Sequence, residues 1–190
     1  MKHLIISLLL LFSCSFLAAQ QSRASLEVNY PLTLGNNFIN NFYTSYVDLG
    51  FRYRFYESSS FQVGGAFHTS FISSQRPIDF DIARTRLHTL QPGIFIEFSL
   101  PGFEIFQPFL GVNYAGLFFD LDNTPFNGLV AEDAFQSGIN PNAGFLIKLS
   151  EKVFLKAQYD FIKTFLSDPL VVTPFNSQIH IIKMGVGVKL

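Results

Sequence analysis

The chain has 190 residues, of which 48% are hydrophobic and only 14% are charged, and its formal net charge is −1. Soluble domains usually carry about a quarter charged residues, so this composition argues against an ordinary soluble domain. It also lacks the basic patch that a nucleic-acid partner normally requires. From the length we expect one domain.

The beginning of the chain predicts export. Residues 2–3 form a short basic head, residues 4–12 are apolar, and residues 17–20 read Leu-Ala-Ala-Gln, as in a cleavage region. We expect a signal peptide over residues 1–19, removed after Sec-type export, and a mature chain over residues 20–190.

A lipoprotein signal is the alternative, because residues 11–14 (Leu-Phe-Ser-Cys) loosely resemble a lipobox ending at Cys14. Against it, Phe12 is unusual at its position, and the apolar stretch continues past Cys14. If cleavage falls after Ala19, the mature chain has no cysteine and no disulfide. No later segment has 18 consecutive apolar residues, so we expect no membrane helix.

Strands follow in the rest of the chain, because apolar side chains alternate there with polar or small ones. The alternation is clearest where Phe51, Tyr53 and Phe55 enclose Arg52 and Arg54. It predicts eight strands, over residues 25–32, 44–56, 61–71, 86–98, 106–118, 140–149, 153–162 and 178–190. Soluble strands usually have about five or six residues, whereas a tilted strand that crosses a bilayer needs about nine to eleven.

The predicted connections alternate in length. Those after the second, fourth and sixth strands are short: 57–60, 99–104 and 150–152. Those after the first, third, fifth and seventh strands are long: 33–43, 72–85, 120–139 and 163–177. Transmembrane barrels have short periplasmic turns and longer external loops, and an even strand number returns the C-terminus to the periplasm.

These patterns predict an all-β fold, an eight-stranded antiparallel up-and-down transmembrane β-barrel in the outer membrane of a Gram-negative bacterium. Backbone groups in lipid must be paired within the protein, so the sheet closes, with its apolar face toward lipid. A soluble lipocalin-like barrel is the alternative. It would place the apolar face inside and require many more charges outside.

Three segments carry a resemblance to a known family. Residues 107–112 read Gln-Pro-Phe-Leu-Gly-Val, residues 142–144 read Asn-Ala-Gly, and residues 154–160 form an amphipathic strand. In these the chain resembles the small outer-membrane barrel family of OmpA/OmpX type that is common in Bacteroidetes-type bacteria. The resemblance implies the eight-stranded barrel and no particular activity. Many such proteins end in Phe, where this chain has Leu190.

Polar side chains on the inward face form the main candidate site. An eight-stranded barrel is narrow enough for side chains to fill it, and buried charges are costly unless paired, so we expect a hydrogen-bonded interior network. A gated channel or proton path is the alternative. The predicted members are Glu27, Asp48, Arg52, Arg54, Gln62, His68, Glu97, Gln107, Asn113, Lys148, Lys156, Gln158, Asp160 and Lys183.

His68 and Ser70 share a strand face, and Glu97 on the next strand is a candidate to orient such a nucleophile–base pair. Because both point inward, away from lipid, we interpret them as lumen filling. We expect His180 at the membrane interface. A lipid A-modifying enzyme stays the alternative, and no catalytic residue, cofactor or metal is expected.

The long loops are the remaining candidates, since loops on a rigid scaffold often carry binding. In the longest, the candidate contacts are Phe126, Glu132, Asp133 and Phe135; its acids lack the spacing of an EF-hand. The first loop is rich in asparagine (Asn36, Asn37, Asn40 and Asn41), and two interpretations stay open for it, a binding segment and a simple solvated connection.

The predicted function is that of a non-enzymatic outer-membrane barrel with a structural or binding role through its external loops. A lipid A-modifying enzyme and a porin-like small-solute channel are the alternatives. The expected partners are outer-membrane lipid and a possible protein bound by the loops, with no nucleic acid. The barrel is expected to be a monomer or a subunit of an envelope complex.

Overall fold

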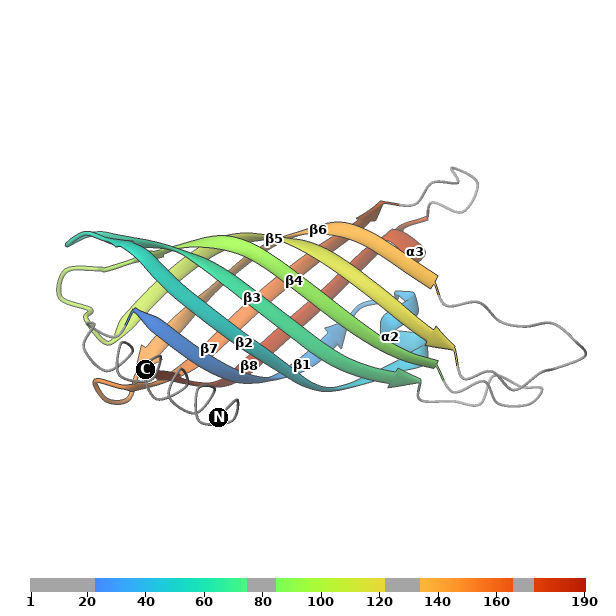
Figure 1. Cartoon of the computed structure of the whole chain (residues 1–190), viewed down its shortest axis with the longest axis horizontal. Coiled ribbons are helices and arrows are strands. Elements are labelled where there is room, and N and C mark those ends of the chain that lie inside the picture. Colours follow the sequence, from blue (N-terminus) through green and yellow to red (C-terminus); the bar gives the residue numbers. More distant parts are fainter. Residues whose placement is uncertain (1–22, 75–84, 122–133, 166–172) are drawn as a thin grey trace, which may run out of the picture.

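Eight antiparallel strands close into a barrel in the computed structural model, which describes residues 23–74, 85–121, 134–165 and 173–190. Each strand pairs with its neighbours in the sequence, and the first pairs with the last (Figure 1). The strands are β1 (Ala24–Leu34), β2 (Tyr43–Glu57), β3 (Phe61–Ser74), β4 (Thr85–Phe98), β5 (Phe106–Leu121), β6 (Ala134–Lys148), β7 (Val153–Phe165) and β8 (Gln178–Lys189). The predicted fold class is confirmed.

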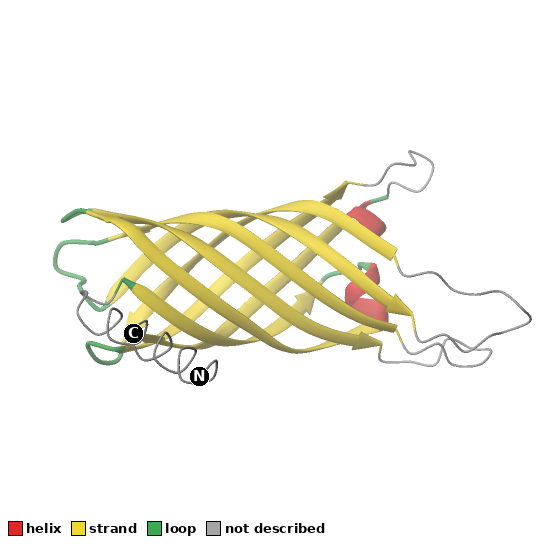
Figure 2. Cartoon of the chain, in the orientation of Figure 1, coloured by secondary structure: helices red, strands yellow, loops and turns green. Residues whose placement is uncertain are grey.

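The two ends of the barrel differ. One end, here called the turn end, holds the short connections after β2, β4 and β6, and the C-terminus (Figure 1). The opposite end, the loop end, holds the longer connections. It also carries two short helices, α2 (Phe38–Phe42) and α3 (Pro174–Ser177), shown in red in Figure 2. The sequence did not predict either helix.

The strand boundaries agree closely with the predictions except at the start of β6. The alternation predicted a start at residue 140, whereas β6 begins at Ala134. Ser137 and Gly138 weaken the pattern there, because neither adds apolar surface. The segment is nonetheless a strand, since the long β5 offers it a pairing partner, with Phe118 opposite Phe135.

The outer wall is apolar along every strand. On β1 the side chains of Leu26, Val28 and Tyr30 are about half exposed, while Glu27 and Asn29 between them are buried. A soluble barrel would have the opposite arrangement, and apolar patches on soluble monomers rarely exceed a few hundred Å². The soluble alternative is therefore wrong, and the apolar wall is suited to lipid.

No helix in the described ranges is both long enough and apolar enough to cross a membrane.

Inward-facing glycines make room for large side chains in the narrow lumen. A Cβ atom at Gly187 would overlap the ring of Phe154, and one at Gly64 would overlap the ring of Phe95. These aromatic rings lie across the glycines of neighbouring strands, so the glycines are needed for close approach. At these positions aromatic rings fill the lumen.

Candidate functional site

The lumen nearest the turn end holds a chain of ion pairs. The guanidinium of Arg54 donates to both oxygens of Glu97, at 2.7 and 3.1 Å. Arg52 lies 2.9 Å from Glu97 and 3.8 Å from Glu27, and the ammonium of Lys156 donates to Glu27 at 2.5 Å. All five side chains are buried, which satisfies the requirement that a buried charge has a partner.

Arg52 is also held by aromatic rings. Its guanidinium carbon lies 3.8 Å from the centroid of Phe95 and 4.5 Å from that of Phe109. Rings at this distance attract a cation through their quadrupole. Phe109 further packs with Leu146 and Phe154 in a small apolar cluster on the turn-end side.

A second cluster fills the middle of the barrel and centres on Lys183. Its ammonium lies 2.9 Å from Asp48 and 2.9 Å from Asp160. Asp48 also accepts from the hydroxyl of Ser70 at 2.7 Å and lies 3.1 Å from Nδ1 of His68. Four strands (β2, β3, β7 and β8) therefore meet at one ammonium and two carboxylates.

Charges balance within the lumen. The fully buried carboxylates of the described residues are Glu27, Asp48, Glu97 and Asp160, and the buried cations are Arg52, Arg54, Lys156 and Lys183. Four positive side chains thus face four negative ones, with His68 between the two clusters. Such a balance keeps the low-dielectric interior free of uncompensated charge.

The lumen nearest the loop end is apolar instead. Leu87, Leu117 and Ile162 from the wall pack around Ile39 of α2, which is 1% exposed. Phe38 of the same helix lies against Phe119, with ring centroids 6.0 Å apart. The helix α2 therefore covers the barrel mouth with an apolar stopper, at the position seen in Figure 1.

The asparagines of the first loop build this stopper, so the interpretation of that loop as a simple solvated connection is wrong. Asn37 is buried and accepts from the backbone N–H of Asn40 at 2.9 Å, as an N-cap side chain does. Its amide also donates to the carbonyl of Leu34 at 2.6 Å, and Asn41 donates to Asn36 at 2.9 Å. An Asn at an N-cap position was the signal that could have indicated the helix.

The structure places the predicted network residues inside the barrel, but it joins only some of them. Gln158 donates to Asp160 at 2.5 Å, in the middle cluster. Gln62, Gln107 and Lys148 lie nearer the turn end, where Lys148 forms no ion pair with any described carboxylate. Asn113 faces the lumen at Gly93 on the neighbouring strand.

The sequence-based prediction missed two members of the network. Asn29 donates to Asp48 at 2.9 Å, and Gln91 accepts from Asn140 at 3.0 Å.

The hypothetical nucleophile–base pair of Ser70 and His68 is arranged differently from the prediction. Asp48, not Glu97, is the acid beside His68 and Ser70. Both side chains bond to this one carboxylate, and within the described residues no hydrogen bond joins His68 to Ser70. Ser70 therefore donates its hydrogen bond to Asp48, not to the imidazole of His68, which the hypothetical pair would require. His180 lies on the outer wall, 2.6 Å from the hydroxyl of Tyr159.

Of the four candidate loop contacts, Phe126, Glu132 and Asp133 lie outside the described residues, as do the predicted signal peptide and Cys14. Phe135 is not a loop residue, and that assignment was wrong. It lies on the outer wall in β6, with its ring centroid 4.8 Å from that of Phe118.

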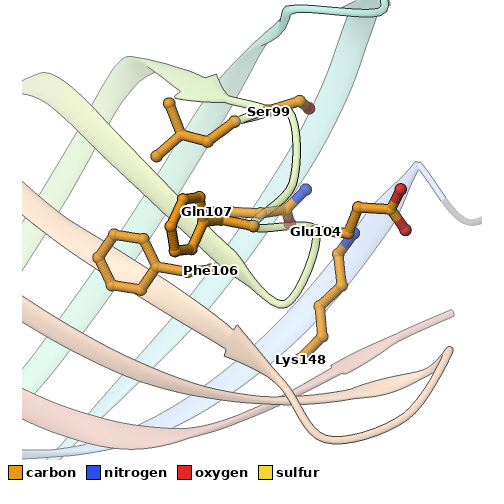
Figure 3. Close-up of a pocket in the computed structure, with 7 residues that line it drawn as sticks. Ser99, Glu104, Phe106, Gln107 and Lys148 are labelled. Atoms are coloured by element: carbon orange, nitrogen blue, oxygen red, sulfur yellow. The ribbon is translucent and has the colours of Figure 1, made fainter.

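A pocket of about 140 Å³ lies at the turn end, beneath the β4–β5 connection (Figure 3). Its lining includes Leu100, Phe103, Glu104, Phe106, Gln107 and Lys148. The sequence placed Gln107 and Lys148 in the interior network and gave no signal that a turn would fold over them.

A scan against protein-family models finds no match, and curated protein sequences give no significant match. Solved structures do resemble the chain. Neisserial surface protein A aligns with a TM-score of 0.56 and 14% identity, covering 88% of this chain and 96% of that protein. Ail, the attachment invasion locus protein of Yersinia pestis, solved with the heparin analogue sucrose octasulfate, gives 0.54 and 12%, covering 87% and 95%. The outer membrane protein OprG of Pseudomonas aeruginosa gives 0.50 and 14%, covering 88% and 93%.

At sequence identities this low, the structural alignments support a shared fold and nothing further. The predicted outer-membrane localisation agrees with that of these neighbours, while the Bacteroidetes-type relationship stays a prediction. With its closed sheet, apolar outer wall and filled lumen, the chain has the fold of the small eight-stranded outer-membrane β-barrels.

Proposed function

We propose that this protein is a non-enzymatic outer-membrane barrel that acts through its external loops, as a binding or structural element of the cell envelope. The observation that carries the proposal is the filled lumen. Eight paired charges and an apolar stopper occupy the interior from one end to the other. Loops carried on a scaffold of this kind often provide the binding surface.

The filled lumen weighs against a small-solute channel. A conducting pore needs a water-filled path, as in barrels of 16 or more strands. Here Ile39 and Phe38 close the loop end, the pairs around Lys183 occupy the middle, and those around Arg52 occupy the lumen toward the turn end. Planar-bilayer recordings that show discrete conductance steps would favour the channel instead.

The position of the Asp48 cluster weighs against a lipid A-modifying enzyme. Ser70 and His68 are buried in the lumen, 1% and 2% exposed, and an enzyme acting on lipid needs its nucleophile at the outer wall. If the cluster were catalytic, deletion of the gene would change the composition of lipid A, and Ser70→Ala would cause the same change. Mass spectrometry of lipid A from both strains tests this directly.

Loop binding is tested by photo-crosslinking in living cells, with a photoreactive residue at Phe126 in the longest connection. We expect a discrete protein adduct, because the proposed protein partner would contact this connection. A matched probe at Leu110, half exposed on the wall of β5, should give none. If Phe126 gives no adduct while the barrel is folded in the outer membrane, binding by this loop is wrong and a purely structural role is favoured.

A further inference from the structure

Beneath helix α2, the wall of the lumen at the loop end forms an apolar cup. Side chains from β3, β4, β5, β7 and β8 line it: Ile72, Leu87, Ala115, Leu117, Phe119, Ile162, Ile179 and Ile181. These residues are here called the loop-end cup. The buried charges of the described residues all lie in the two polar clusters, so none belongs to the cup.

The cup is closed at its base. On β8 the inward positions Ile179 and Ile181 are followed by Lys183, and on β7 Ile162 is preceded by Asp160. Lys183 and Asp160 form an ion pair, 2.9 Å apart, directly below these aliphatic side chains. Because the sheet is also closed, the loop end is the only entrance to the cup.

Helix α2 fills the cup through apolar contacts. Ile39 is buried among the lining residues, and Phe38 packs on Phe119. Among the described residues, the hydrogen bonds of residues 35–42 join these residues to each other or to the adjacent ends of β1 and β2. The helix is therefore a self-contained unit, and only apolar packing attaches it to the far side of the wall.

Gly35 connects this unit to β1 and is suited to act as a hinge. Its φ is 79°, and a Cβ atom at this position would have nothing within 4 Å. Residues at the ends of elements absorb the backbone change when a segment moves, and glycine does so with the fewest steric restrictions. Segments held by few contacts open before the whole molecule does.

We propose that the loop-end cup binds a small uncharged apolar molecule, which enters from the loop end and displaces α2. The molecule replaces the side chains of Ile39 and Phe38, so it has about the size of one hydrocarbon ring. A dry apolar cavity in a protein binds benzene in this way. A charged group is excluded, because the cup holds no charge to pair with it. This role goes beyond loop-mediated binding of a protein, which does not require α2 to move.

The test is a titration of the full barrel in lipid nanodiscs with toluene, followed by NMR of isoleucine methyl groups. We expect saturable shifts in the cup, at Ile72, Ile162, Ile179 and Ile181. Ile94 and Ile139, which are exposed on the lipid-facing wall, should shift in proportion to added toluene, since they report its partitioning into lipid. Benzylammonium, the charged analogue, should give no saturable shift. Absence of saturation in the cup, or the same response in both sets of methyl groups, would overturn the proposal.

Displacement of α2 is tested separately. Toluene should quicken hydrogen exchange in α2, whereas a molecule that bound beside the helix would slow it. Asn37→Ala removes the N-cap without touching the cup, so it should raise the open population, and with it the affinity for toluene, about fivefold. Asn41→Ala, which removes an exposed bond to Asn36, is the matched control and should change the affinity less. Slower exchange in α2, or an affinity unchanged by Asn37→Ala, would contradict displacement.

Discussion

The two halves of the lumen are filled by different interactions, ion pairs in one and apolar packing in the other. Toward the turn end and in the middle, paired charges such as Lys183 with Asp48 and Asp160 fill the space. Toward the loop end, aliphatic side chains pack around Ile39, which comes from a helix in a connection and not from the wall. The first half ties strands to each other, whereas the second ties a connection to the strands.

This difference predicts where damage spreads. An ion pair between β-strands stabilises the barrel as a whole. Removing one partner leaves the other charge buried and unpaired at low dielectric. A contact between α2 and the wall can be lost locally, since regions held by few contacts open before the whole molecule does. The following substitutions test that distinction.

The largest effect is expected for Lys183→Met, which leaves Asp48 and Asp160 buried together without their cation. Breaking a buried pair costs about 3–5 kcal/mol, and the whole barrel should lose that stability. Denaturant unfolding in lipid vesicles, followed by circular dichroism, measures it. Lys152→Met on an exposed turn is the control, and adding Asp160→Asn should recover part of the loss. A cost below about 1 kcal/mol, within the range of an exposed pair, would contradict the interpretation.

Ile39→Ala should cost about 2–3 kcal/mol, the low part of the range for buried Ile→Ala, and the loss should be confined to the stopper. Hydrogen exchange should quicken in α2 while the amides of β7 and β8 keep their protection. Phe42→Ala, at an exposed position on the same helix, serves as the comparison. Equal loss of protection throughout the barrel would mean that the stopper is part of the global fold.

Gly187→Ala should destabilise the barrel by about 1–3 kcal/mol, the usual cost of overpacking, because the new methyl group overlaps the ring of Phe154. The double variant Gly187→Ala with Phe154→Leu should regain part of this loss in the same unfolding assay. Gly35→Ala is a poor control, since its φ of 79° is itself strained for Ala. If the two substitutions add without coupling, the ring is not the cause.

The smallest effect is expected for Asn37→Ala, which removes the N-cap of α2. Such caps contribute about 1 kcal/mol, and the change should again appear only in the exchange rates of the stopper. Asn41→Ala, which removes an exposed side-chain bond to Asn36, should change them less. A larger effect for Asn41 would reverse the roles that the structure gives to these side chains.

The strands and faces were predictable because a period of two is a property of the backbone, which the sequence displays wherever one face meets lipid. The pairing within the lumen was not. Asp48 joins His68 and Ser70 because two adjacent strands have a particular register, and Lys183 reaches Asp160 across the seam between β7 and β8. Registers of this kind depend on where each connection ends, and the sequence left those ends uncertain by several residues at β6.

The stopper was missed for a related reason. Ile39 is an apolar residue in a short, Asn-rich connection, and its burial depends on the open mouth that the wall provides. Leu87, Leu117 and Ile162 follow the inward parity of their strands, but nothing local showed that they required a covering helix. The apolar character of those positions, in a lumen expected to be polar, was the available signal.

The seam between β1 and β8 has a consequence for how the protein is made. Ser25 pairs with Lys189, and the backbone N–H of Leu190 donates to the carbonyl of Ala24 at 3.0 Å. Contacts this distant in sequence form slowly, because a long loop must be closed first. Until β8 is in place, β1 presents an unpaired edge that invites aggregation. We therefore expect the β1–β8 seam to close last, in the step that completes the barrel.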